Sequence, residues 1–110
     1  MGWIRHHGIV VTSEQRDKLQ AAHAKATEIF PAVSPIVDGV VNSSGSFFVP
    51  PDGSNEGWLE SGNGDIQRDA FVEYLESSSM DWIEYELDRN GGEARIKRAS
   101  VQLQRKYPNE

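Results

Sequence analysis

Residue types suited to ligand binding fall into two segments of the chain. The candidates are Arg5 and His7 near the start, and Trp58, Ser61, Gly62, Gly64 and Arg68 in the middle. An indole ring can stack on a planar ligand, a guanidinium or imidazole can hold an anion, and glycines let a ligand approach the backbone. These residues predict a ligand-binding site if the fold brings the two segments together.

A glycine-rich run in the middle segment precedes an expected helix. Gly62-Asn63-Gly64-Asp65 leads into that helix, and Arg68 falls in its first turn. Free N–H groups at a helix start, together with one guanidinium, suit a phosphate or a carboxylate. The alternative is ordinary capping, in which the Asp65 side chain accepts hydrogen bonds from the same N–H groups. The run lacks the Walker and dinucleotide fingerprints, so the motif alone does not decide between the two.

Residues 50–65 form no expected helix or strand. An irregular segment of this length is uncommon inside a compact domain, and it is usually either functional or disordered. Trp58 argues against disorder, because a large aromatic side chain in a loop usually packs on something. It either closes the core at the sheet edge or stacks on a planar ligand such as a nucleobase.

The histidine doublet is a poor metal motif. His6 and His7 fall in an expected strand, where adjacent side chains point to opposite faces and cannot chelate one metal together. Only one of them can face the helix-side core. We expect a partly buried His6, and His7 with Arg5 as a polar contact on the open face. His23 is expected at the boundary of a helix core, and no metal, cofactor or catalytic arrangement is expected.

Charge and composition limit the function. The chain has 110 residues, a net charge of −6 and no cysteine, which fits one domain without disulfides in a reducing cytoplasm. The carboxylates concentrate between residues 38 and 92, which argues against general nucleic-acid binding. No apolar run is long enough to span a membrane. We expect one domain over residues 1–104 and a flexible tail over residues 105–110.

Hydrophobic periodicity predicts seven elements. One expected helix follows a Thr12–Gln15 capping box and ends at about Phe30. The other begins after an Asp65 cap and ends at about Ser77. The expected strands cover residues 3–12, 36–41, 47–49, 81–88 and the segment after residue 92, which could continue through Val101 and Leu103.

The last two strands give the clearest pattern. Asn90-Gly91 predicts a type I′ turn, with Arg89 opposite Gly92. In this register Glu86 faces Arg95 and Glu84 faces Lys97 on an exposed face. Leu87 faces Ala94 and Tyr85 faces Ile96 on the apolar face. Opposite charges and apolar residues align in the same register, which supports it.

The order β-α-β-β-α-β-β predicts an α+β, ferredoxin-like fold with an added C-terminal edge strand. Both helices then cover one face of an antiparallel sheet. Trp3 and Trp82 are expected on the uncovered face. An apolar patch on that face is typical of a homodimer interface, and the sequence leaves open whether the chain forms a homodimer.

Two strings in the chain resemble a group of small accessory proteins encoded by tailed bacteriophages. They are the opening GWIRHHGIVVTS over residues 2–13 and the loop PDGSNEGW over residues 51–58, together with Ser61, Gly64-Asp65 and Arg68. The resemblance covers most of the chain and brings no catalytic assignment. It implies a phage protein acting in the cytoplasm of a bacterial host.

The resemblance also implies function by binding. One hypothesis is a nucleotide sponge that sequesters an immune signal, using Trp58 for stacking, Arg5, His7 and Arg68 for charge, and Gly62 and Gly64 as backbone donors. The alternative is an inhibitor or adaptor of a host protein, whose acidic centre mimics nucleic acid toward a basic surface. A nucleotide phosphodiesterase using His6 or His7 is a third hypothesis.

Overall fold

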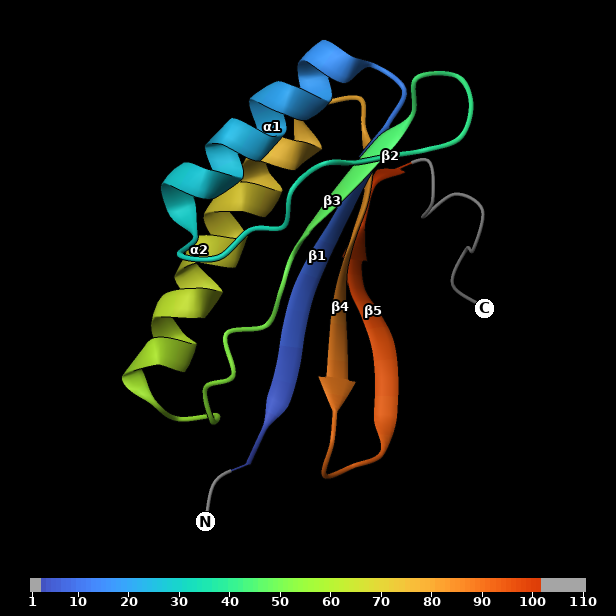
Figure 1. Ribbon diagram of the computed structural model, residues 1–110. Coiled ribbons are helices and arrows are strands. Elements are labelled where there is room, and N and C mark those ends of the chain that lie inside the picture. Colours follow the sequence, from blue (N-terminus) through green and yellow to red (C-terminus); the bar gives the residue numbers. More distant parts are fainter. Residues whose placement is uncertain (1–2, 102–110) are drawn as a thin grey trace.

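Five strands form one antiparallel sheet, and two helices cover one of its faces (Figure 1). The computed structural model describes residues 3–101. Along the chain the elements are β1 (Arg5–Ser13), α1 (Arg16–Ile29), β2 (Val37–Asp38), β3 (Gly45–Val49), α2 (Leu59–Glu76), β4 (Asp81–Asp88) and β5 (Glu93–Ala99).

The strand order is β2-β3-β1-β4-β5, with every neighbouring pair antiparallel. The central strand β1 therefore pairs with β3 on one side and with β4 on the other. This order and the two helices confirm the expected α+β, ferredoxin-like architecture with an added edge strand β5.

The core lies between the helices and the covered face of the sheet. Ile9 and Val11 of β1 and Leu19 of α1 are fully buried there. Phe71 of α2 joins the layers, because its ring meets Phe30 edge-on at 5.6 Å between centroids and lies 6.5 Å from Phe47 of β3. Within residues 3–101, no helix is long and apolar enough to cross a membrane.

Helix α2 begins at Leu59, so the expected start at Asp65 is wrong. Gly57 has a positive φ of 91° and Trp58 is extended, and the helix begins directly after them. The irregular segment therefore covers only residues 50–58. Asp65 lies inside the helix and does not cap it.

Helix α1 also differs at its start. Strand β1 continues through Ser13, and the helix begins at Arg16 with no side-chain hydrogen bond at its N-cap, so the predicted capping box does not form. The Ser13 hydroxyl instead accepts a hydrogen bond from the Gln15 N–H at 2.9 Å. The helix ends at Ile29, just before Pro31, close to the expected end.

The β2–β3 hairpin differs from the prediction in both strands, because β2 is shorter than expected and β3 begins at Gly45, before the expected start at residue 47. Strand β2 contains only two residues, whereas the pattern predicted a strand over residues 36–41. Asn42 and Ser43 both have positive φ values and form the turn, which the Ser44 N–H closes by donating to the Val41 carbonyl at 3.2 Å.

The register of the β4–β5 hairpin is confirmed near its turn, where Glu86 faces Arg95 and Tyr85 faces Ile96. A bulge then shifts the pairing, so Arg98 and not Lys97 lies opposite Glu84. The expected Asn-Gly type I′ turn is wrong as well. Within residues 89–92 only Gly92 has positive φ.

The Asp88 carboxylate fixes that turn by accepting hydrogen bonds from the N–H groups of Asn90 and Gly91, at 3.1 and 3.0 Å. Strand β5 ends at Ala99, so it does not continue through Val101. Leu103 and the expected tail over residues 105–110 lie outside the described residues.

The two faces of β4 are the reverse of the prediction. Trp82, Glu84 and Glu86 are buried on the covered face, and Ile83, Tyr85 and Leu87 lie on the open face. The reason is the pairing with β1, in which Val11 faces Trp82 and Ile9 faces Glu84. Paired residues of antiparallel strands share a face, and Ile9 and Val11 pack under the helices.

The open face carries exposed apolar side chains, among them Phe48, Leu87 and Ile96. The Tyr85 ring lies across Gly8 there, since a Cβ at residue 8 would come within 2.3 Å of the ring and hydroxyl. Burial raises the pKa of Tyr85. Trp3 does not lie on this open face as expected. Its half-exposed ring is on the side of Arg5 and Asp88, with the Arg5 guanidinium stacked on it at 4.6 Å and its indole N–H donating to Asp88 at 3.2 Å.

Candidate functional site

A groove runs between the irregular segment, the first turns of α2 and Pro31, two residues beyond the end of α1. Its outer part has a volume of about 360 Å³. The residues that line it are Pro31, Asp52, Gly53, Ser54, Trp58, Glu60, Asn63 and Gln67. Trp58 is 53% exposed at this groove, so its ring is available for contact with a ligand.

A smaller cavity of about 50 Å³ adjoins the groove and shares Pro31, Asp52 and Gln67 with it. Its other walls include His7 of β1 and Arg68 of α2, with Phe30 and Val49 as apolar neighbours. The cavity therefore places the imidazole of His7 and the guanidinium of Arg68, from two different elements, beside the groove.

The irregular segment is held in place at both ends. The Glu56 N–H donates to the Trp3 carbonyl at 2.7 Å, and the Glu56 carboxylate accepts a hydrogen bond from the buried Ser61 hydroxyl at 3.3 Å. Near the other end, Asp52 accepts hydrogen bonds from the Ser54 N–H at 2.9 Å and the Ser54 hydroxyl at 2.7 Å. These contacts fix the shape of the groove wall.

His7 lies between two carboxylates beneath α2. Its Nε2 is 3.4 Å from a Glu56 oxygen, and its Nδ1 is 3.6 Å from a Glu86 oxygen. The ring is buried, and Nδ1 has no hydrogen-bond partner among the described residues. This corrects the expected faces, because His7 and not His6 is on the helix side. The alternation of β1 forces this arrangement, since His7 shares a face with Ile9.

Arg68 is buried with three carboxylates around its guanidinium. Its Nη2 donates to Asp65 at 2.5 Å, and its Nε lies 3.7 Å from a Glu84 oxygen. A Cβ at residue 64 would lie 3.0 Å from Arg68 Nη1 and 3.2 Å from Asp52 Oδ2, so both groups crowd the helix backbone at Gly64. The glycine leaves the space that Arg68 and Asp52 occupy.

Asp52 is ionised at neutral pH and can accept hydrogen bonds in the groove. Burial raises the pKa of its carboxyl, but the two hydrogen bonds from Ser54 and the nearby charges of Arg68 and His7 outweigh burial. The pKa of Asp52 is therefore lowered from its ordinary value.

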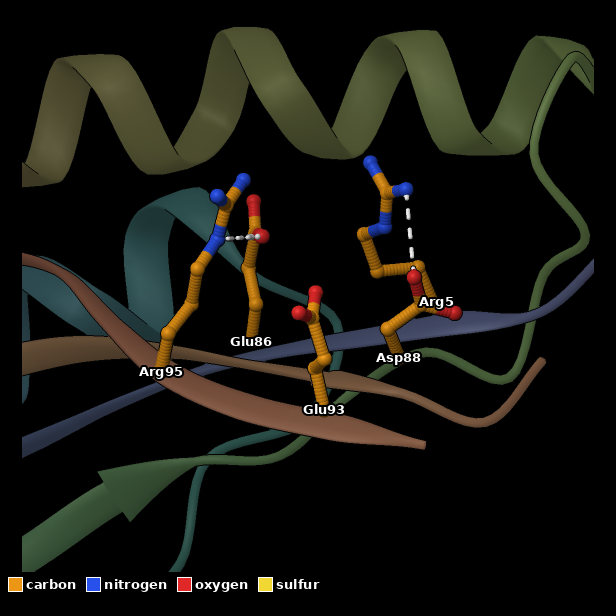
Figure 2. A pocket seen from close by; sticks show the side chains of 5 residues that line it. All are labelled: Arg5, Glu86, Asp88, Glu93 and Arg95. Carbon is orange, nitrogen blue, oxygen red and sulfur yellow. Dashed lines mark hydrogen bonds and ion pairs between the residues drawn. The ribbon is translucent and has the colours of Figure 1, made fainter. Parts of the chain in front are cut away.

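A second polar pocket lies near the β4–β5 turn, on the covered face of the sheet (Figure 2). It has a volume of about 70 Å³ and is lined by Arg5, Glu86, Asp88, Glu93 and Arg95. Arg5 lies 3.5 Å from Asp88, and the Arg95 Nε–H donates to Glu86 at 2.8 Å. Both arginines are therefore paired with carboxylates of the same pocket. We interpret the pocket as an ion-pair cluster that stabilises the fold and not as a ligand site.

The structure gathers some of the predicted site residues and separates others. His7, Gly64 and Arg68 line the inner cavity, and Trp58 lines the groove. Ser61 is not among the residues that line either space, but its hydroxyl donates to the Glu56 carboxylate, which lies beside His7. Arg5 belongs to the other cluster.

Gly62 is exposed on α2, and an added Cβ there would have nothing within 4 Å. Because residues 62–65 lie inside α2, this run forms no helix start, and neither of its two alternatives, an anion site at a helix N-terminus or capping by Asp65, holds. Sequence reasoning missed Asp52, Asn63 and Gln67 as groove residues. The Asp-Gly-Ser run at residues 52–54 is typical of a side-chain-stabilised turn and could have identified Asp52.

His23 is partly buried beside Phe47, with Nε2 2.9 Å from the Ser34 carbonyl oxygen, a boundary position for this ring. Among residues 3–101, no group of three or more histidine, aspartate or glutamate side chains is arranged to hold a metal ion.

The chain matches no protein-family model, and it has no match among curated proteins or solved structures.

Proposed function

We propose that this chain is a binding protein that takes up a small nucleotide-type molecule in the groove beside Trp58 and withholds it from other proteins. The observation that carries the proposal is the half-exposed Trp58 ring on a groove of about 360 Å³. Pockets for small molecules usually have volumes of about 300–1,000 Å³ and combine an apolar wall with a few polar groups. The groove lies in this size range and sets the rings of Pro31 and Trp58 beside several polar side chains, among them Asn63 and Gln67.

The side chains that could catalyse a reaction already contact other groups of the protein, which fits binding without turnover. The Ser61 hydroxyl is buried and donates to Glu56, so it does not face His7 as a nucleophile faces its base. His7 is itself held between Glu56 and Glu86. A general acid or base must reach the substrate proton, and His7 meets the groove only through the small inner cavity.

The phage resemblance extends this proposal to an anti-defence role, in which the bound molecule is a nucleotide signal of the infected cell. The alternative, an acidic surface that mimics nucleic acid, has less support. Glu84 and Glu86, two carboxylates of the acidic centre that the sequence pattern placed on an exposed face, are buried and paired with arginines.

Calorimetric titration with adenosine monophosphate and with a cyclic dinucleotide tests the proposal. We expect binding of at least one of them, and Trp58→Ala should weaken it about tenfold, since stacking of a base on an aromatic ring contributes about 1–3 kcal/mol. Leu59→Ala is the matched control, because Leu59 is the exposed neighbour outside the groove lining. Absence of binding at millimolar ligand, or equal loss in both variants, would refute the proposal.

A further inference from the structure

We infer that the groove recognises the base of its ligand, through N–H groups on a planar ring, and leaves any phosphates in solvent. The ligand class is therefore a nucleoside or the nucleoside part of a nucleotide. This inference rests on the proposed function and specifies which end of the ligand the protein binds.

The charges along the groove oppose a phosphate. The described residues that line its outer part include two carboxylates, Asp52 and Glu60, and no lysine, arginine or histidine. Phosphate binding normally uses arginine, lysine or several free N–H groups. A phosphate placed here would face negative charge without a compensating cation.

The inner cavity does not supply that cation. Its arginine, Arg68, already faces Asp65 and Glu84, and Asp52 lies beside it at Gly64. His7 likewise lies between two glutamates. A volume of about 50 Å³ holds only a few water molecules, so a phosphate does not reach these groups without displacing the wall.

The same groups suit the edge of a base. Carboxylates accept hydrogen bonds from ring N–H and exocyclic amino groups, and the amides of Asn63 and Gln67 can both donate and accept. Trp58 offers its ring face for stacking at the same groove. Glu60 is exposed in the first turn of α2, where its carboxylate can meet a base stacked on the neighbouring indole.

Calorimetric titration of the full chain with adenosine, guanosine, cytidine, their mono- and diphosphates, and pyrophosphate tests this inference at low and high salt. For the base that binds, we expect Kd values of nucleoside and nucleotides to agree within about threefold, because phosphates in solvent add little free energy. Pyrophosphate should neither bind nor compete, and salt should have little effect. Affinity that increases with each phosphate and decreases with salt would overturn this inference while leaving the proposed function intact.

Glu60→Gln adds a test of the contact itself. We expect this variant to weaken nucleoside binding about tenfold, because hydrogen bonds to a charged group are stronger than those to a neutral one. Glu73→Gln, an exposed glutamate of the same helix outside the groove lining, is the matched control. Unchanged nucleoside affinity in Glu60→Gln would refute recognition by this carboxylate, and absence of binding by every nucleoside and nucleotide would refute the proposed function as well.

Discussion

Glu84 is a fully buried carboxylate whose two oxygens face arginines from different elements. One oxygen accepts a hydrogen bond from Arg98 of β5, and the other lies 3.7 Å from Arg68 of α2. Burying a carboxylate without partners costs several kcal/mol, so these two arginines offset a large penalty. The side chain thereby joins β4, β5 and α2 in one charged cluster beneath the helix.

The Arg98 side chain should therefore matter far more than an exposed arginine. We expect Arg98→Met to lower the free energy of unfolding by about 3 kcal/mol, because it removes the closest partner of a buried charge. Arg89→Met, an exposed residue of the β4–β5 turn, should change it by less than about 0.5 kcal/mol. Urea denaturation of both variants measures the difference, and equal stabilities would contradict a structural role for the Glu84 cluster.

At the scale of elements, the sequence pattern predicts the order and pairing of the strands better than their faces. The facing of Glu86 and Arg95 follows from charge and turn spacing alone. The buried face of β4 does not, because alternation makes Ile83, Tyr85 and Leu87 the more apolar set. These glutamates can be buried because Arg98 and Arg95 of β5 pair with them and because Arg68 and His7, far away in the sequence, lie beside them.

The sequence likewise predicted part of the candidate site, namely several of its side chains, but not the backbone and tertiary contacts that position them. Trp58, His7 and Arg68 have side chains whose chemistry is visible in the sequence, and they do line the groove or its inner cavity. The start of α2 was not predictable, because two glycines lower the local helix propensity. The contacts of Arg68 and Asp52 at Gly64 are tertiary and leave no local pattern.

The early start of α2 predicts opposite behaviour for its two glycines. Gly62→Ala should stabilise the protein by about 1 kcal/mol, because Gly62 is helical and an added Cβ meets open space. Gly64→Ala should be less stable than Gly62→Ala, since its Cβ would crowd Arg68 and Asp52. Thermal unfolding of the two variants makes the comparison, and no gain from Gly62→Ala would argue that the helix begins later.

At the scale of the whole molecule, buried and turn carboxylates make the fold sensitive to acid. Burial raises the pKa of Glu86, but the Arg95 hydrogen bond and the charges of Arg95, His7 and Lys97 outweigh it, so this pKa is lowered. The pKa of Asp88 is lowered as well, chiefly by the hydrogen bond from the Gly91 N–H. A carboxyl with a lowered pKa in the folded protein stabilises the fold only while it is ionised.

Protonation of these two carboxyl groups lowers the free energy of unfolding as the pH falls. The ordinary pKa values are 4.5 for Glu86 and 3.8 for Asp88, and the folded values lie below them. Their stabilisation is fully present above these ordinary values and is lost as pH falls through the lower, folded values. We therefore expect the free energy of unfolding to decrease steadily below about pH 4.5.

Glu86→Gln isolates one part of this effect. Because glutamine does not titrate, the variant should be less stable near neutral pH but should lose less stability on acidification than the original chain. Glu73→Gln, whose exposed side chain lies on α2, should keep the original slope. Urea denaturation at a series of pH values measures the three slopes. If the slope for Glu86→Gln were identical to that of the original chain, the ion pairs of Glu86 would not cause the acid sensitivity. Other titrating groups would then account for the loss of stability at low pH.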